Sequence, residues 1–112
     1  MADPIEIDRL TYRRVAPPAR PRDATSAKAK QFWDIVEPDG GAVVAHAEVF
    51  EKPDQWGVRL FDRAPQLDEI ELTRIVANLL VWHAGAQVET VELWLARNGA
   101  RSVLVRVRGD YV

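Results

Sequence analysis

The sequence predicts an α+β fold: a single antiparallel sheet of four or five strands, with one long amphipathic helix packed on one face and an N-terminal extended arm. Residues 42–62 and 88–108 each read as a β-hairpin, because apolar and polar side chains alternate on both sides of a turn. Between them, the residues after Asp68 repeat their apolar side chains at helical spacing. The expected order is therefore hairpin, helix, hairpin, and 112 residues suffice for one hydrophobic core.

The first predicted hairpin joins residues 42–51 to residues 55–62 through the turn Lys-Pro-Asp. Strict alternation over both segments gives each strand one apolar side. Residues 31–37 are read as a preceding strand that ends at the turn cluster Pro-Asp-Gly-Gly, with a short helix as the open alternative. The apolar sides of the hairpin consist of Val43, Ala45, Ala47, Val49, Trp56, Val58 and Leu60.

The helix start at Asp68 is the clearest local signal in the chain. Glu71 stands three residues after Asp68, as a capping box requires, and Leu67 and Leu72 are placed to form a hydrophobic staple. Gly85 suits the end of the helix, because glycine adopts the left-handed conformation found there. The apolar stripe consists of Leu72, Ile75, Val76, Leu79, Leu80 and, at its end, His83.

The second hairpin is expected to turn at Arg97-Asn98-Gly99, between strands 88–96 and 100–108. A three-residue loop would place Leu93 opposite Val103 and would keep one face apolar, because a one-residue slip would exchange the two faces. The opposite, outer face would then expose apolar surface that a monomer rarely shows in one patch. Its predicted members are Thr90, Glu92, Trp94, Leu104, Arg106 and Arg108, with Phe50 or Trp33 as further candidates.

Opposite charges divide the chain into a basic arm, residues 1–30, and an acidic body, residues 31–112. Residues 9–30 hold seven Lys or Arg and one acid, whereas residues 31–112 hold eight basic and thirteen acidic side chains. Three prolines break the arm after residues 5–15, which could form an edge strand in their own sheet or in a neighbour's. We expect the arm to clasp an acidic protein surface, either its own or that of another copy. Its cations are Arg9, Arg13, Arg14, Arg20, Arg22, Lys28 and Lys30.

His46 and Glu48 are the weak candidates for chemistry. They stand two residues apart on a predicted strand, so both side chains point to the same face, as in an acid–base pair. His83, at the end of the helix, is read as structural. The chain has no cysteine, and we find no catalytic motif or cofactor fingerprint, so no cofactor and no metal site are predicted.

These features favour a small non-catalytic interaction or accessory domain that associates with itself through the outer sheet face and the arm. One alternative is a ligand-binding or enzymatic domain that uses His46 and Glu48, with Arg59 as a further candidate. A second is nucleic-acid binding through the arm, which is disfavoured because Tyr12 is the one aromatic among seven cations. We expect a cytoplasmic protein with a protein partner and no membrane association. The interaction candidates are Trp82, Trp94, Glu92, Leu104, Arg106, Arg9, Arg13, Arg14, Arg20 and Arg22.

Overall fold

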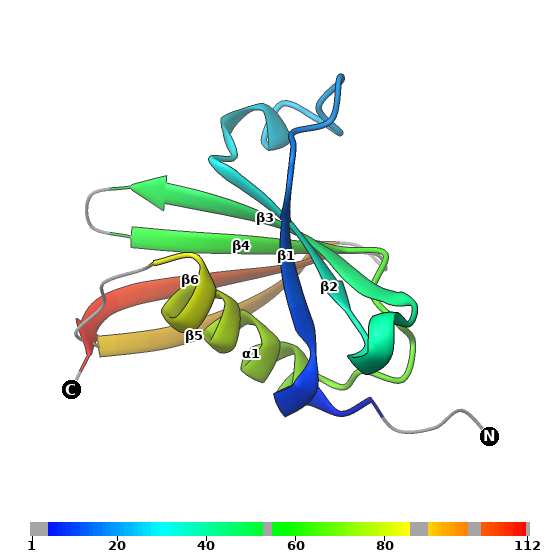
Figure 1. The fold of residues 1–112 in the computed structure, drawn as a ribbon. Helices are drawn as coiled ribbons and strands as arrows, with labels where there is room; N and C mark the ends of the chain where they lie inside the picture. Colours follow the sequence, from blue (N-terminus) through cyan, green and yellow to red (C-terminus); the bar gives the residue numbers. More distant parts are fainter. Residues whose placement is uncertain (1–4, 53–54, 86–89, 99–101, 112) are drawn as a thin grey trace.

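The computed structural model describes residues 5–52, 55–85, 90–98 and 102–111, with side chains for residues 5–38, 40–51 and 56–85. Six strands form one antiparallel sheet in the order β1-β2-β3-β4-β6-β5. Helix α1 lies across one face of this sheet, which we call the inner face (Figure 1). The predicted α+β class is confirmed. The strands are β1 Thr11–Val15, β2 Gln31–Val36, β3 Val43–Lys52, β4 Gln55–Phe61, β5 Thr90–Asn98 and β6 Ser102–Tyr111.

The sheet contains one strand more than the upper prediction, because residues of the arm belong to it. All five residues of β1 pair with β2, so β1 forms an edge of its own chain's sheet. Residues 31–36 are a strand, and the short-helix alternative for this segment is wrong. The chain between β1 and β2, residues 16–30, is called the connecting segment below; it runs from blue to cyan in Figure 1.

Helix α1 (Glu69–Asn78) continues without a break into a π-helical turn, Leu79–His83. The capping box is confirmed: the Glu71 N–H donates to the Asp68 carboxylate over 2.8 Å, and the Asp68 N–H donates to Glu71 over 3.2 Å. The helical segment ends before Gly85, whose φ of 82° is left-handed as predicted. The buried stripe consists of Leu72, Ile75, Val76, Leu79 and Leu80, which pack on Ile35, Ala45, Ala47, Val49, Val58 and Leu60.

The N-terminal residues contribute directly to this core. Ile5, Ile7 and Leu10 are buried in the same cluster as the helix stripe, and the short 3-10 turn Ile7–Arg9 lies against α1. Trp33, a candidate for the outer face, is instead buried in the core. It belongs to the inner face because it pairs in register with Ala47.

A ring cluster fixes β1 to the end of the helical segment. Tyr12 stacks on His83 with ring centroids 4.4 Å apart, and Trp33 meets the same imidazole edge-on at 6.2 Å. The Tyr12 hydroxyl is buried without a hydrogen-bond partner among the described residues. Burial raises the pKa of Tyr12, more than the nearby Asn78 side chain lowers it. His83 therefore has a packing role in the structure.

The closing pair of the second hairpin lies two residues later in the chain than predicted. Asn98 pairs with Ser102, and Leu93 pairs with Val107 instead of Val103. The predicted register is therefore wrong. The shift in pairing is even, however, so apolar positions still oppose apolar positions, as Leu95 and Val105 do.

Candidate functional site

The outer face of the sheet, opposite α1, brings together polar side chains from three strands. Asp34 on β2 lies beside His46 on β3, and His46 lies beside Phe61 on β4. Since paired residues of an antiparallel sheet point to the same side, these three side chains form one row. The next row along the same strands contains Phe32, Glu48 and Arg59.

A β-bulge makes Asp34 and His46 neighbours. Val36 pairs with Val43 but Ile35 pairs with Ala45, so Val44 is an extra residue without a partner on β2. The Val44 carbonyl instead accepts a hydrogen bond of 2.7 Å from the Ala64 N–H. Without the bulge, Asp34 would stand opposite Ala45. The single inserted residue therefore creates the Asp34–His46 pair.

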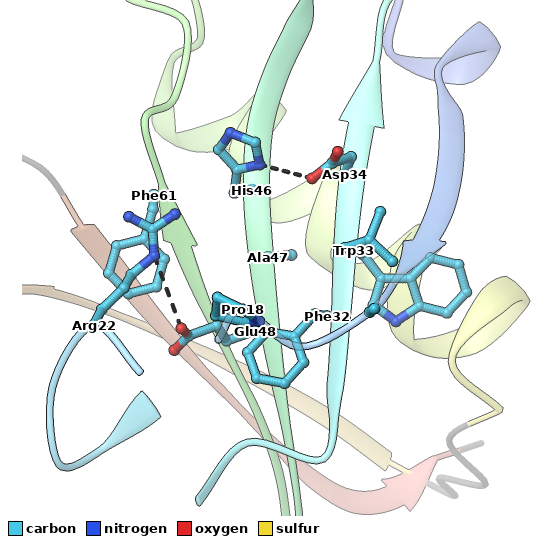
Figure 2. A pocket seen from close by; sticks show the side chains of 11 residues that line it. Pro18, Arg22, Phe32, Trp33, Asp34, His46, Ala47, Glu48 and Phe61 are labelled. Carbon is cyan, nitrogen blue, oxygen red and sulfur yellow. Dashed lines mark hydrogen bonds and ion pairs between the residues drawn. The ribbon is translucent and has the colours of Figure 1, made fainter. Parts of the chain in front are cut away.

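The imidazole of His46 is oriented by the Asp34 carboxylate. His46 Nδ1 lies 2.7 Å from Asp34 Oδ1, and since a carboxylate only accepts, Nδ1 carries the hydrogen (Figure 2). Arg13 Nη2 lies 3.5 Å from the other Asp34 oxygen. The His46 side chain is 38% exposed, and Nε2 has no partner among the described residues. This arrangement leaves one ring nitrogen accessible to a ligand.

Glu48 is nearly fully buried, at 3% exposure, and is held by three groups. The Ser26 hydroxyl donates to its carboxylate over 2.8 Å, Arg59 Nη1 lies at 3.7 Å, and Arg22 Nε lies at 3.9 Å. A buried carboxylate requires such partners because removing an unpaired charge from water is very unfavourable. Two of the three, Ser26 and Arg22, come from the connecting segment.

The connecting segment docks on the outer face through charges of both signs. Its acid, Asp23, accepts two hydrogen bonds from the Arg59 guanidinium, of 3.0 and 2.8 Å. The adjacent Arg22 lies near two carboxylates of the body, those of Glu48 and Asp62. Within the chain, the connecting segment therefore contacts the body through charge pairs of both polarities.

Arg59 holds the pKa of Asp23 well below its usual range, and the Ser26 N–H adds to the effect. Because the folded pKa is lowered, the resulting stability is complete above the ordinary aspartate pKa of about 3.9 and is lost as the pH falls toward the folded value. We therefore expect Asp23→Asn to lower the melting temperature at pH 7, by an amount that shrinks below pH 4. Thermal scans of both proteins between pH 7 and pH 2.5 test this. A deficit that is independent of pH would contradict it.

A hollow of about 170 Å³ lies on the outer face between the two rows and the start of the connecting segment. Figure 2 shows His46 and Asp34 on one side of it, Phe32, Glu48 and Pro18 on another, and Arg22 against Phe61. The lining therefore combines aromatic rings with charged groups that already have partners. Such a surface can hold and orient a bound group.

The chain was compared with protein-family models, with curated proteins and with solved structures. No match was found in any of the three. Among the described residues, no three His, Cys, Asp or Glu side chains gather as metal ligands. The same part of the chain contains no helix long and apolar enough to cross a membrane.

The structure separates the predicted site residues into three groups. His46, Glu48, Arg13 and Arg22 converge on the outer face, whereas Arg9 pairs with Glu6 at the surface, 3.1 Å apart. Arg14 and Arg20 are exposed, and so is Trp82, at 77%. Four interaction candidates, Trp94, Glu92, Leu104 and Arg106, have side chains outside the described residues; their backbones pair Trp94 with Arg106 and Glu92 with Arg108.

The residues of the site that were not predicted from the sequence include Asp23, Ser26, Asp34 and Phe61. Asp23 could have been noticed because it is the single acid among the seven basic residues of 9–30. A count of net charge hides it. Asp34 could be found only from the register of β2 on β3, which the bulge at Val44 alters, and Phe61 only from the register of β3 on β4. Arg59, considered only as a possible helper of His46 and Glu48, is the centre of the charge network.

Proposed function

We propose that this protein is a small, non-catalytic interaction domain that associates with a second copy of itself through the outer sheet face and the N-terminal segment. One observation carries the proposal: the outer face already binds a polypeptide segment, residues 22–26, through side chains that match it in charge and hydrogen bonding. A surface that binds one segment of this chain is complementary to the same segment of another copy.

Exchange of the N-terminal segment is the simplest route to such a dimer. Strand β1 is an edge strand, and it is joined to β2 by fifteen residues, of which 16–25 are exposed. If residues 27–30 extend, the β1–β2 pairing and the Asp23–Arg59 contact re-form unchanged between two copies. Exchange therefore preserves the β1–β2 pairing and the Asp23–Arg59 contact, at the cost of backbone hydrogen bonds donated by residues 27–30.

A disulfide trap tests the exchange, because the chain has no cysteine of its own. Thr11 and Val36 are partners across β1 and β2, at a separation typical of cross-strand disulfides. We expect the Thr11→Cys/Val36→Cys variant, refolded at high concentration and oxidised, to give a covalent dimer on a non-reducing gel. Light scattering of the wild type should show a dimer under the same conditions.

The single variants Thr11→Cys and Val36→Cys are the controls, since any dimer they form reflects random oxidation. A disulfide found only within one chain, together with a strictly monomeric wild type, would contradict the proposal.

The exposed indole of Trp82, next to Val81 at 36% exposure, lies on the helical segment rather than on the outer face. Trp82→Ala should therefore leave the dimer unchanged.

Small-ligand binding in the hollow beside His46 is a second candidate function. It is favoured by the oriented imidazole and by the aromatic walls around it. A ligand-induced melting shift that His46→Gln abolishes would support it. Nucleic-acid binding has weaker support, because Arg9, Arg13 and Arg22 already form ion pairs with carboxylates of this chain.

A further inference from the structure

We infer that the outer face contains a guanidinium-binding site, made by Phe61, Glu48 and Asp62, which the chain's own Arg22 occupies. The inference rests on the proposed function, which makes the outer face a recognition surface, and it names the chemical group that is recognised. Arginine side chains of a docked segment and free alkylguanidines share this group.

The ring of Phe61 forms the floor of the site. The guanidinium carbon of Arg22 stands 4.3 Å from the ring centroid, within the range of a cation–π contact. Arg59 approaches the same ring at 4.8 Å, but its charge is matched by the two hydrogen bonds to Asp23. The ring thus supports a second cation, Arg22 (Figure 2), beside an already neutralised one.

Two carboxylates lie beside the Arg22 guanidinium. Arg22 Nε lies 3.9 Å from Glu48, and Arg22 Nη2 lies 3.6 Å from Asp62. Both separations exceed hydrogen-bond length, and the Arg22 side chain is 42% exposed. Arg22 is therefore held by charge and ring contact alone, loosely enough for another guanidinium to replace it.

The backbone conformation of Asp62 positions its carboxylate in this site. Asp62 has a φ of 51°, the one non-glycine residue among those described with a left-handed backbone. Aspartate tolerates this conformation better than most residues other than glycine and asparagine. At the end of β4, it places the Asp62 carboxylate opposite Arg22.

Removal of the resident group provides the test. In Arg22→Ala the site keeps its ring and both carboxylates, and we expect the melting temperature to fall by roughly 3 °C, as for the loss of a surface ion pair and a cation–π contact. Methylguanidinium at about 50 mM, far below denaturing concentrations, should recover at least half of this loss by occupying the site. Sodium chloride at equal ionic strength should not.

The wild type, whose site is filled, should gain nothing from methylguanidinium. Arg22→Ala/Phe61→Leu and Arg22→Ala/Asp62→Asn should also gain nothing; asparagine tolerates the left-handed backbone, so the second variant removes only the charge. Equal gains in all four proteins would overturn the inference. If Arg22→Ala melts like the wild type, amide shifts on titration decide: changes confined to residues 48 and 61–62 support the site, and their absence overturns it.

The outcome is separable from that of the disulfide trap. If methylguanidinium restores the melting temperature of Arg22→Ala but the disulfide trap gives only disulfides within one chain, the guanidinium site is supported and the exchanged dimer is excluded. A covalent dimer without rescue would do the reverse. A peptide of residues 16–30 with Arg22, tested against its Arg22→Ala form on the same variant, shows whether a polypeptide arginine serves as well as the free ion.

Discussion

Replacing Arg59 with methionine is expected to lower the free energy of unfolding by about 3 kcal/mol, with a fall in melting temperature of roughly 10 °C. The reason is the group that the substitution leaves behind. Glu48 is 3% exposed, and Arg59, itself 8% exposed, is its most buried cationic partner. Without Arg59, the carboxylate keeps the Ser26 hydroxyl and the more distant Arg22, which do not replace a buried counter-charge.

Methionine is chosen because it retains most of the apolar stem of arginine and removes the guanidinium. The substitution also frees Asp23 from its two hydrogen bonds, so the connecting segment should loosen. We therefore expect amide protons near Ser26 to exchange faster in Arg59→Met, as measured by hydrogen exchange. A loss of stability below 1 kcal/mol would show that water already solvates Glu48.

A double-mutant cycle measures the interaction between Arg59 and Glu48. Its second single variant is Glu48→Gln, which keeps the shape of the side chain and an oxygen that can accept a hydrogen bond from Ser26. On its own it should be milder than Arg59→Met, because Arg59 retains Asp23. In the double variant no buried carboxylate is left unpaired, so its loss should be smaller than the sum of the single losses by about 1 to 2 kcal/mol. Strict additivity would mean that the two side chains do not interact.

The helix is the part of this fold that local sequence determines most fully. Asp68, Glu71 and the apolar repeat after them lie within a few residues of one another, so the relevant interactions depend on little else. The two strands of the first hairpin can likewise be predicted from the alternation of apolar and polar side chains. Their register cannot, because it depends on bulges and on turn positions that alternation leaves free.

The site depends on that register, and this is why its residues were only partly predicted. His46 and Glu48 share a face by simple period-two spacing, but their partners come from β2, β4 and the connecting segment. Val44, an ordinary strand residue by its type, shifts β2 against β3 by one position. Nothing in its immediate neighbourhood marks it as the inserted residue.

The charge asymmetry of the sequence does not describe how the connecting segment is held, because the contacts join single residues of both signs. The basic stretch includes one acid, Asp23, and the acidic body supplies its partner, Arg59. The net charge of each part does not reveal a single acid in a basic stretch or an individual cation in an acidic one. Individual contacts are therefore better guides to where the segment docks than the total charge of either part.

The remaining large effect concerns Ile7 and Leu10, which lie in the predicted arm but are buried in the core. We expect Ile7→Ala/Leu10→Ala to lower the free energy of unfolding by about 4 kcal/mol, since truncation of a buried Ile or Leu to Ala costs about 2 kcal/mol or more. That is a large share of the roughly 5 to 15 kcal/mol that stabilises a small domain. Urea denaturation followed by tryptophan fluorescence measures the change.

Asp8→Ala/Arg9→Ala is the matched control, because these two residues occupy the same 3-10 turn but are exposed. It should change stability by less than about 1 kcal/mol. If both double variants are neutral, the N-terminal residues are an appendage that can detach without loss. If only the buried pair is destabilising, the N-terminal segment is structural in every copy, and a dimer formed by exchange must return an equivalent segment to each core.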